Sequence, residues 1–144
     1  MKCEDVMTKD PICCLPDDTV VKAAKQMTQN DFGSLPVIES EESKKIVGIL
    51  TDRDLVLKVV GEAHDPQSVQ VKEVMTKNVI TCFKEDDLQR AMDAMADYQL
   101  RRIPVLGNGN RIVGIIAQAD IATRLDQPEK TASVVKDISK SVKE

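Results

Sequence analysis

The sequence predicts a mixed α/β fold of the α+β class, built from two copies of one β-α-β-β-α unit. Three observations lead to this prediction: the chain repeats itself, each copy alternates short apolar runs with helical periodicity, and the core must be aliphatic because aromatic residues make up only 2% of the chain. We expect the two copies to pack sheet to sheet about a pseudo-twofold axis, since three strands cannot bury both of their faces alone.

The internal repeat is the strongest signal in the sequence. The run VMTK at residues 6–9 recurs at residues 74–77, and the register holds without a gap through the PV pairs at 36–37 and 104–105. After a loop that is shorter in the second copy, IVGI at 46–49 matches IVGI at 112–115. The predicted organisation is repeat one at 1–61, a linker at 62–68, repeat two at 69–127 and a tail at 128–144.

Each copy carries the same elements in the same order. Apolar residues recur at helical spacing from Val20 and from Leu88. Acidic residues precede both helices, where they interact favourably with the helix dipole and accept hydrogen bonds from free backbone N–H groups. The tail is predicted to form an amphipathic helix that docks on the pair or on a second chain. Its apolar positions are Val134, Val135, Ile138 and Val142. The predicted strands are 12–15 and 79–83, 35–38 and 103–106, and the fully buried 46–50 and 112–116, with second helices at 52–60 and 118–125.

Composition argues against several classes of function. The net charge of −4 gives no basic footprint for nucleic acid, and the scarcity of aromatic residues leaves no platform for stacking bases. No apolar run is long enough to span a membrane, and the charged start predicts no secretory signal and a cytoplasmic location. The four cysteines lack metal-binding spacing, so we predict no metal site and reduced thiols.

Two acidic residues stand at the start of the second helices, Asp54 and Asp120. Thr51 precedes Asp54 by three residues, which is the spacing of a capping box and requires no ligand. In the second copy the matching position is Ala117, which has no hydroxyl group. The sequence therefore makes the two equivalent positions unequal.

The repeated unit closely resembles the CBS domain, and two in tandem resemble a Bateman module. The resemblance rests on the G-x-x-P-V-h and h-V-G-h-h-T-x-x-D stretches, where h is apolar, and it covers about residues 1–125. It implies a regulatory module that binds AMP, ADP, ATP or S-adenosylmethionine in clefts between the repeats. It also implies a homodimer, for which we expect helix faces carrying Ala91, Met92 and Met95 to meet a second copy.

The resemblance also implies roles for individual residues. Asp54 and Asp120 would hold the ribose hydroxyls, and Thr51 would lie near the phosphate. Arg101 and Arg102 would contact phosphate, although adjacent arginines are ordinarily a solvated loop pair. Thr8 and Thr76 precede the first strands and would help to line the adenine pocket, and the alternative is a simple turn before a buried strand. The other implied site residues are Gly33 and Ser34, which allow close backbone approach, and Pro36, Ile12 and Ile80, of which the two isoleucines help to line the adenine pocket.

The cysteines are interpreted as packing residues. Cys3 aligns with Val71 and Cys14 aligns with Cys82, so these positions suit small buried hydrophobic side chains. The role of the vicinal pair formed by Cys13 and Cys14 is left open.

We therefore expect a stand-alone regulatory protein that is not an enzyme, requires no cofactor and has an adenine nucleotide or S-adenosylmethionine as its ligand. Such a module would serve energy sensing and signal to a protein partner. The first alternative is a structural dimerisation module with a decayed pocket. The second is a fragment related to the CBS insert of inosine monophosphate dehydrogenase. The sequence does not name the ligand, the partner or the number of occupied clefts.

Overall fold

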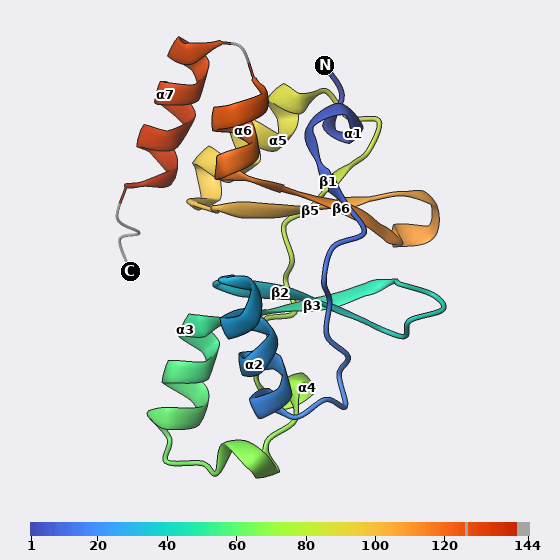
Figure 1. Ribbon diagram of the computed structural model, residues 1–144, viewed down its shortest axis with the longest axis vertical. Coiled ribbons are helices and arrows are strands. Elements are labelled where there is room, and N and C mark those ends of the chain that lie inside the picture. The colour runs from blue at the N-terminus through green and yellow to red at the C-terminus, as the bar shows by residue number, and fades with distance from the viewer. Residues whose placement is uncertain (126, 141–144) are drawn as a thin grey trace. The chain divides into compact units, whose positions relative to one another are not determined.

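The computed structural model describes residues 1–125 and 127–140, and the chain divides between two units (Figure 1). Unit 1 consists of Met1–Pro11 together with the residues from Ile80 onward, and unit 2 is Ile12–Val79. The first eleven residues thus belong to the unit of the second repeat, and the segment between the repeats belongs to the unit of the first. The mixed helix and strand content confirms the α+β class.

Unit 2 is built around the helix α2 and an antiparallel hairpin. The Thr19 hydroxyl caps α2 by accepting the Lys22 N–H at 3.2 Å, and Asp31 ends the helix in the left-handed conformation. In the hairpin, Ser34 pairs with Thr51 and Val37 with Gly48. The elements are α2 (Val20–Asn30), β2 (Ser34–Ile38), β3 (Ile46–Thr51), α3 (Asp52–Leu55), the π-helix η1 (Val56–Val60), the 3-10 helix η2 (Pro66–Ser68) and α4 (Val71–Val74).

The segment that follows η2 completes unit 2. Ile49 and Thr76 exchange backbone hydrogen bonds of 2.9 and 2.8 Å, and on the other side of the hairpin Cys14 forms a parallel bridge with Val37. The resulting order is the Thr76 segment, β3, β2 and the Cys14 segment. The core under this layer contains Cys14, Val20, Ala23, Met27, Leu35, Val37, Leu50, Val59, Val69, Val71 and Val74.

Unit 1 repeats this order as a four-stranded sheet, β1-β6-β5-β4. β1 and β5 pair antiparallel with β6, and β4 pairs parallel with β5. The equivalence explains why residues 1–11 lie here: they occupy the position that the Thr76 segment occupies in unit 2. The elements are α1 (Cys3–Val6), β1 (Thr8–Lys9), β4 (Cys82–Phe83), α5 (Leu88–Tyr98), β5 (Arg102–Leu106), the 3-10 helix η3 (Asn108–Asn110), β6 (Ile112–Ala117), α6 (Gln118–Arg124) and α7 (Pro128–Ile138).

The helix α7 packs on unit 1 beside α5 and α6. Its side chains Val134 and Ile138 are buried in the core of this unit, and each buried aliphatic side chain contributes roughly 1.5–3 kcal/mol. Val142, the last apolar position of the predicted tail helix, lies outside the described residues.

Three local predictions are wrong. Residues 12–15 form only the bridge at Cys14, and the equivalent predicted strand 79–83 is likewise reduced to Cys82–Phe83. The strand β3 is not fully buried, since Val47 and Ile49 are partly exposed. The helix face carrying Ala91, Met92 and Met95 was expected to meet a second copy. These side chains are instead buried in the core of unit 1, at most 2% exposed.

Close backbone approach between β1 and β6 requires a glycine, which gives a first prediction. A Cβ atom at Gly114 would collide with the Met7 side chain and would lie 3.0 Å from the Thr8 carbonyl oxygen. Gly114→Ala should therefore lower the free energy of unfolding by about 1–3 kcal/mol in urea denaturation. Gly33→Ala is the control, because its Cβ would meet nothing closer than 3.5 Å. Equal unfolding midpoints for the two variants would contradict this role of Gly114.

Candidate functional site

The carboxylate of Asp54 is the centre of the polar cluster in unit 2. Asp54 is only 7% exposed, the one charged side chain classed as buried among residues 1–125 and 127–140. It accepts the Thr51 N–H at 3.0 Å and the Thr76 hydroxyl at 3.2 Å, and it forms an ion pair with Lys58 Nζ at 3.0 Å. These partners are what make burial of the charge tolerable.

The start of α3 holds this carboxylate in place. The Thr51 hydroxyl accepts the Asp54 N–H at 3.0 Å while Asp54 accepts the Thr51 N–H, which completes a capping box. Lys58 lies one turn further along and also donates to the Val74 carbonyl oxygen at 2.9 Å. The helix start and the Thr76 segment are therefore joined through a single acidic group.

Asp120 has the same position in unit 1 but weaker partners. It accepts the Ala117 N–H at 2.8 Å, and the Thr8 hydroxyl donates to it at 3.5 Å. Arg124 Nε lies 3.8 Å away, while the guanidinium of Arg124 donates to the carbonyl oxygens of Val6 and Met7 at 2.8 and 3.1 Å. Because Ala117 offers no hydroxyl, the reciprocal half of the capping box is missing here.

The residue pairs before β2 and β5 lie next to these helix starts. The Gly33 carbonyl oxygen accepts the Asp52 N–H at 2.9 Å, and the Arg101 carbonyl oxygen accepts the Gln118 N–H at 2.8 Å. Arg102 pairs with Ala117 in the sheet, as Ser34 pairs with Thr51. Each unit therefore has one carboxylate and one strand start at the same edge of its sheet. The residue pair at the strand start is uncharged in unit 2 and carries two arginines in unit 1.

The remaining predicted site residues are less closely tied to the carboxylates. Pro36 is buried within β2, Ile12 in unit 2 is 37% exposed, and Ile80 packs against the core of unit 1. Sequence reasoning missed Lys58 and Arg124, although each stands four residues after its aspartate, a spacing that places two side chains on one helix face.

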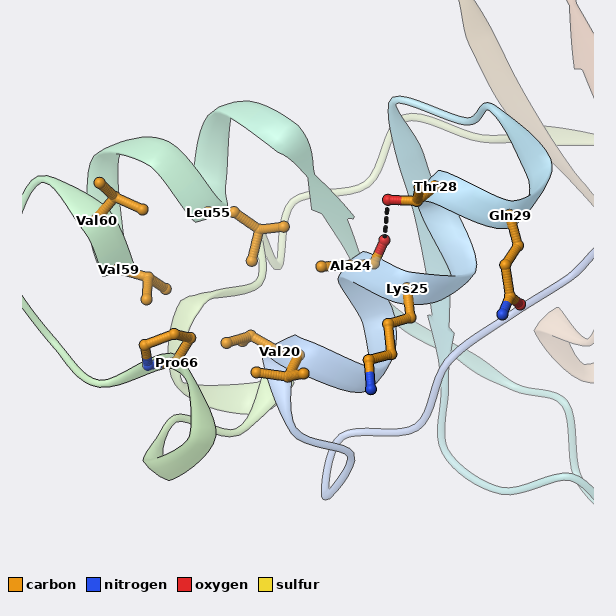
Figure 2. Close-up of a pocket in the computed structure, with 10 residues that line it drawn as sticks. Val20, Ala24, Lys25, Thr28, Gln29, Leu55, Val59, Val60 and Pro66 are labelled. Atoms are coloured by element: carbon orange, nitrogen blue, oxygen red, sulfur yellow. Dashed lines mark hydrogen bonds between the residues drawn. The ribbon is translucent and has the colours of Figure 1, made fainter.

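An apolar cavity of about 510 Å³ opens beside α2 in unit 2 (Figure 2). Lys25 and Thr28 are polar side chains at its edge, and neither Asp54 nor Thr76 lines it. Next to it η1 exposes aliphatic side chains, with Leu57 51% and Val60 72% exposed. The lining residues are Val20, Val21, Ala24, Lys25, Thr28, Gln29, Leu55, Val59, Val60 and Pro66.

Comparison with known proteins identifies the family of this repeat. A model of the CBS domain matches the chain twice, at residues 3–61 and 71–127. The chain belongs to the CBS domain family. The resemblance inferred from the two repeated stretches is thus confirmed, and the protein is a tandem CBS domain protein.

Two relatives show the settings in which such CBS pairs occur. The uncharacterised protein YlbB of Bacillus subtilis is 34% identical over 138 residues, which cover 96% of this chain and 91% of YlbB. Inosine-5'-monophosphate dehydrogenase of Methanocaldococcus jannaschii is 37% identical over 129 residues, which cover 89% of this chain but only 24% of that enzyme. A CBS pair of this kind therefore occurs both as nearly a whole protein and as a part of a larger one.

Two solved structures share the fold of the CBS pair. Hypoxic Response Protein I, solved with two coordinated zinc ions, has a TM-score of 0.78 at 30% identity and covers 87% of this chain and 99% of its own. The CBS domain pair of protein MJ0100, solved in complex with 5'-methylthioadenosine and S-adenosyl-L-methionine, has a TM-score of 0.73 at 28% identity and covers 90% and 98%. In this chain, no three His, Cys, Asp or Glu side chains within the described residues cluster as a metal site. None of its described helices is long and apolar enough to cross a membrane.

The unequal caps give a second prediction. Thr51→Ala should reduce the free energy of unfolding by about 1 kcal/mol without ligand, because the Asp54 N–H loses its acceptor. Ala117→Thr is the reciprocal variant and should raise stability by up to about 1 kcal/mol by supplying the missing hydroxyl. Urea denaturation measures both changes, and negligible effects in both variants would contradict the capping role.

Proposed function

We propose that this CBS pair is a regulatory module that binds an adenosine-containing ligand and has no catalytic activity of its own. AMP, ADP, ATP and S-adenosylmethionine are the candidate ligands. The observation that carries the proposal is the repeated arrangement of a carboxylate, Asp54 or Asp120, at a helix start with a threonine hydroxyl directed at it. The complex of MJ0100 with two adenosine derivatives supports this ligand class.

The chemistry of the carboxylates suits a ribose. Two vicinal hydroxyl groups can both donate to one carboxylate, whose two oxygens accept about four hydrogen bonds in all. In unit 2, Asp54 already accepts from a backbone N–H, from Thr76 and from Lys58, so a ribose would have to replace a partner. In unit 1, the long contact from Thr8 leaves more accepting capacity on Asp120. We therefore infer that the site of unit 1 accepts the ribose at lower cost.

The charges beside the carboxylates separate the two sites further. Arg101 and Arg102 stand at the strand start next to Asp120, and guanidinium groups bind phosphate with two parallel hydrogen bonds. The equivalent positions in unit 2 are Gly33 and Ser34, which carry no charge. We infer that the site of unit 1 selects ligands with more phosphate groups, and that the site of unit 2 accepts a neutral or lightly charged adenosine moiety. A response to the phosphate content of the adenine nucleotide pool would make the module an energy sensor.

We further propose that the chain forms a homodimer through unit 2. The open cavity beside α2 and the exposed aliphatic side chains of η1, Val56, Leu57 and Val60, together make a surface that two copies can bury against each other. A ligand that changed this association, or the surface offered to a protein partner, would turn binding into a signal.

Ligand binding should raise thermal stability. At about 100 times the dissociation constant, a bound ligand adds about 2.7 kcal/mol to the free energy of unfolding, which differential scanning fluorimetry detects. The panel is AMP, ADP, ATP, S-adenosylmethionine and adenosine, with GTP as a control for general phosphate binding. If none of the adenosine compounds at millimolar concentration changed the melting temperature, the result would favour the structural module with a decayed pocket.

The arginine pair gives a sharper test by calorimetry. Arg102→Ala should weaken ATP binding roughly ten- to a hundredfold and adenosine binding little, because a charge-assisted hydrogen bond to phosphate is lost. Ser34→Ala is the matched control, since Ser34 occupies the same register position in unit 2. Asp120→Asn should weaken ATP and adenosine alike. If Arg102→Ala weakened the affinities for ATP and for adenosine equally, the arginines would have no role in phosphate binding.

The proposed dimer can be tested by light scattering. The wild-type chain should show a mass of about twice 15.9 kDa at micromolar concentration. Leu57→Glu should give the single chain, because a charge would have to be buried in the apolar contact. Thr123→Glu, at the equivalent exposed position of α6, should remain dimeric. A wild-type chain that scatters as 15.9 kDa throughout would contradict the proposal.

A further inference from the structure

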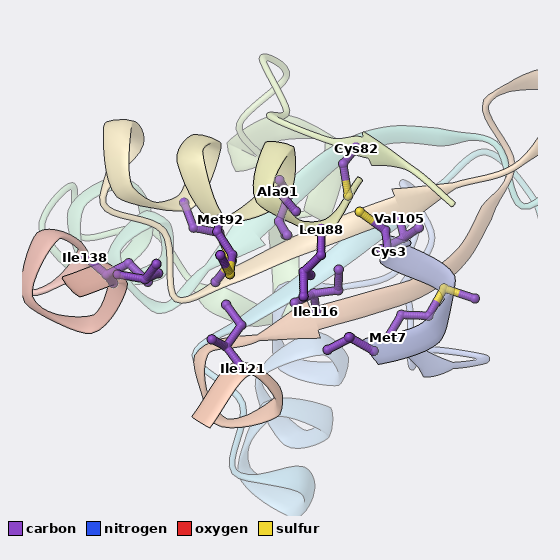
Figure 3. Close-up of a cluster of buried hydrophobic side chains, with 14 residues drawn as sticks. Cys3, Met7, Cys82, Leu88, Ala91, Met92, Val105, Ile116, Ile121 and Ile138 are labelled. Carbon is purple, nitrogen blue, oxygen red and sulfur yellow. The ribbon is translucent and has the colours of Figure 1, made fainter. Parts of the chain in front are cut away.

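Two of the four cysteines meet inside unit 1. Cys3, at the start of α1, and Cys82, at the start of β4, are 0% and 3% exposed. Figure 3 shows their sulfur atoms directed toward each other, and each thiol donates to a backbone carbonyl oxygen 3.8 Å away, that of Asp87 for Cys3 and that of Pro104 for Cys82. Both cysteines are free.

The backbone fixes the positions of both thiols. Cys3 N–H donates to the Asp86 carbonyl oxygen at 2.9 Å, and Glu4 N–H donates to that of Lys84 at 3.0 Å. Cys82 lies on β4 opposite Val105 of β5. The contact therefore joins the amino-terminal segment, residues 1–11, to the edge strand of a sheet that comes from a distant part of the chain.

Unit 2 shows that the packing does not require a second thiol. Cys14 stands where Cys82 stands in the repeat, and both sulfurs lie near the carbonyl oxygen of the proline in the adjacent strand, at 3.7 Å for Cys14 and 3.8 Å for Cys82. The position equivalent to Cys3 is Val71, which is fully buried. Valine thus fills this position beside Cys14 in unit 2, so packing against the first-strand cysteine does not need a second thiol, and only unit 1 brings two thiols together.

We propose that Cys3 and Cys82 are a reversible disulfide site that fastens the amino-terminal segment to unit 1. With hydrogen peroxide as oxidant, the Cys3 thiolate attacks one peroxide oxygen, the O–O bond breaks, and a sulfenic acid forms as hydroxide leaves. Cys82 then attacks the Cys3 sulfur, the S–S bond forms, and the sulfenic oxygen leaves as water. The balance is two thiols and one peroxide giving one disulfide and two waters. A low-molecular-weight dithiol reverses the step.

The electrostatics agree with this order of events. The neighbouring Cys82 side chain lowers the pKa of the Cys3 thiol, whereas burial and the carboxylates of Asp86 and Asp87 raise it. The neighbouring Cys3 side chain, followed by burial, raises the pKa of Cys82. This direction of the two pKa values is why we assign the first step to Cys3. Because both sulfurs are buried, a small oxidant reaches them when the terminal segment opens locally.

The disulfide would act on the candidate site of the same unit. Thr8 follows Cys3 by five residues and directs its hydroxyl at Asp120. A covalent bond at Cys3 limits the opening of this segment and keeps Thr8 beside the carboxylate. This effect on the ligand rests on the proposed function, whereas formation of the disulfide does not.

Peptide mapping of the full chain tests the proposal without any ligand. After treatment with hydrogen peroxide and blocking of free thiols, non-reducing digestion should give one peptide pair that links Cys3 to Cys82, within a single chain that is about 2 Da lighter. The melting temperature should rise by roughly 10 °C, since the bond closes a long loop of the unfolded chain, and dithiothreitol should reverse both changes.

Two variants serve as matched controls. Cys3→Val, which copies the side chain of Val71, should melt like the reduced wild type and should show no change on oxidation. Val71→Cys places a thiol opposite Cys14 and should gain a second linked peptide pair. The proposal is overturned if the folded wild type links Cys13 to Cys14 instead, if it links Cys3 to Cys82 only between chains, or if its melting temperature falls on oxidation. Each of these results leaves the proposed ligand binding untouched.

Discussion

The pairing of a short threonine-bearing segment with the third strand of each repeat is the contact on which the rest of this structure depends. Thr76 exchanges two backbone hydrogen bonds with Ile49, and Thr8 pairs with Ile115. The preceding methionine lies over a glycine, Gly48 or Gly114, which lets the backbones approach. The pairing closes the sheet layer of each unit and brings a hydroxyl group to the carboxylate at the next helix start. The fold and the candidate site therefore rest on the same few hydrogen bonds.

One scaffold carries two different chemical environments. In unit 2, Asp54 is capped, ion-paired and nearly buried, so its oxygens are mostly committed to the protein. In unit 1, Asp120 has a longer contact with its threonine, Arg124 reaches mainly to backbone carbonyls, and basic residues stand at the strand start. The thiol contact between Cys3 and Cys82 also exists only in unit 1. These differences lie at side chains, while the order in which the segments pair is the same in both units.

Much of the fold could be predicted because its signals are local. The repeat, the helices and the capping box at Thr51 follow from residue spacing alone, and Lys58 could have been found in the same way. The membership of residues 1–11 in the unit of the second repeat could not be predicted, because a repeat shows which residues correspond to each other but not which ones pair in the sheet. The buried faces of α5 illustrate the same limit: Met92 and Met95 are apolar whether a helix turns them to its own core or to a partner. Ligand identity is not encoded in any local pattern.

The exchange of segments also bears on how such a protein could arise. The polypeptide passes from one unit to the other twice, at residues 11–12 and again at residues 79–80. A single repeat cut at its sequence boundaries would carry a first segment that belongs to another unit and would lack the one that completes its own. Two copies of a one-repeat chain could complete each other only by trading these segments. Gene duplication and fusion would then preserve an arrangement already present in a dimer of single repeats. Later substitutions, such as those that left Val71 and Cys3 at equivalent positions, could make the two halves differ without disturbing the exchange of segments.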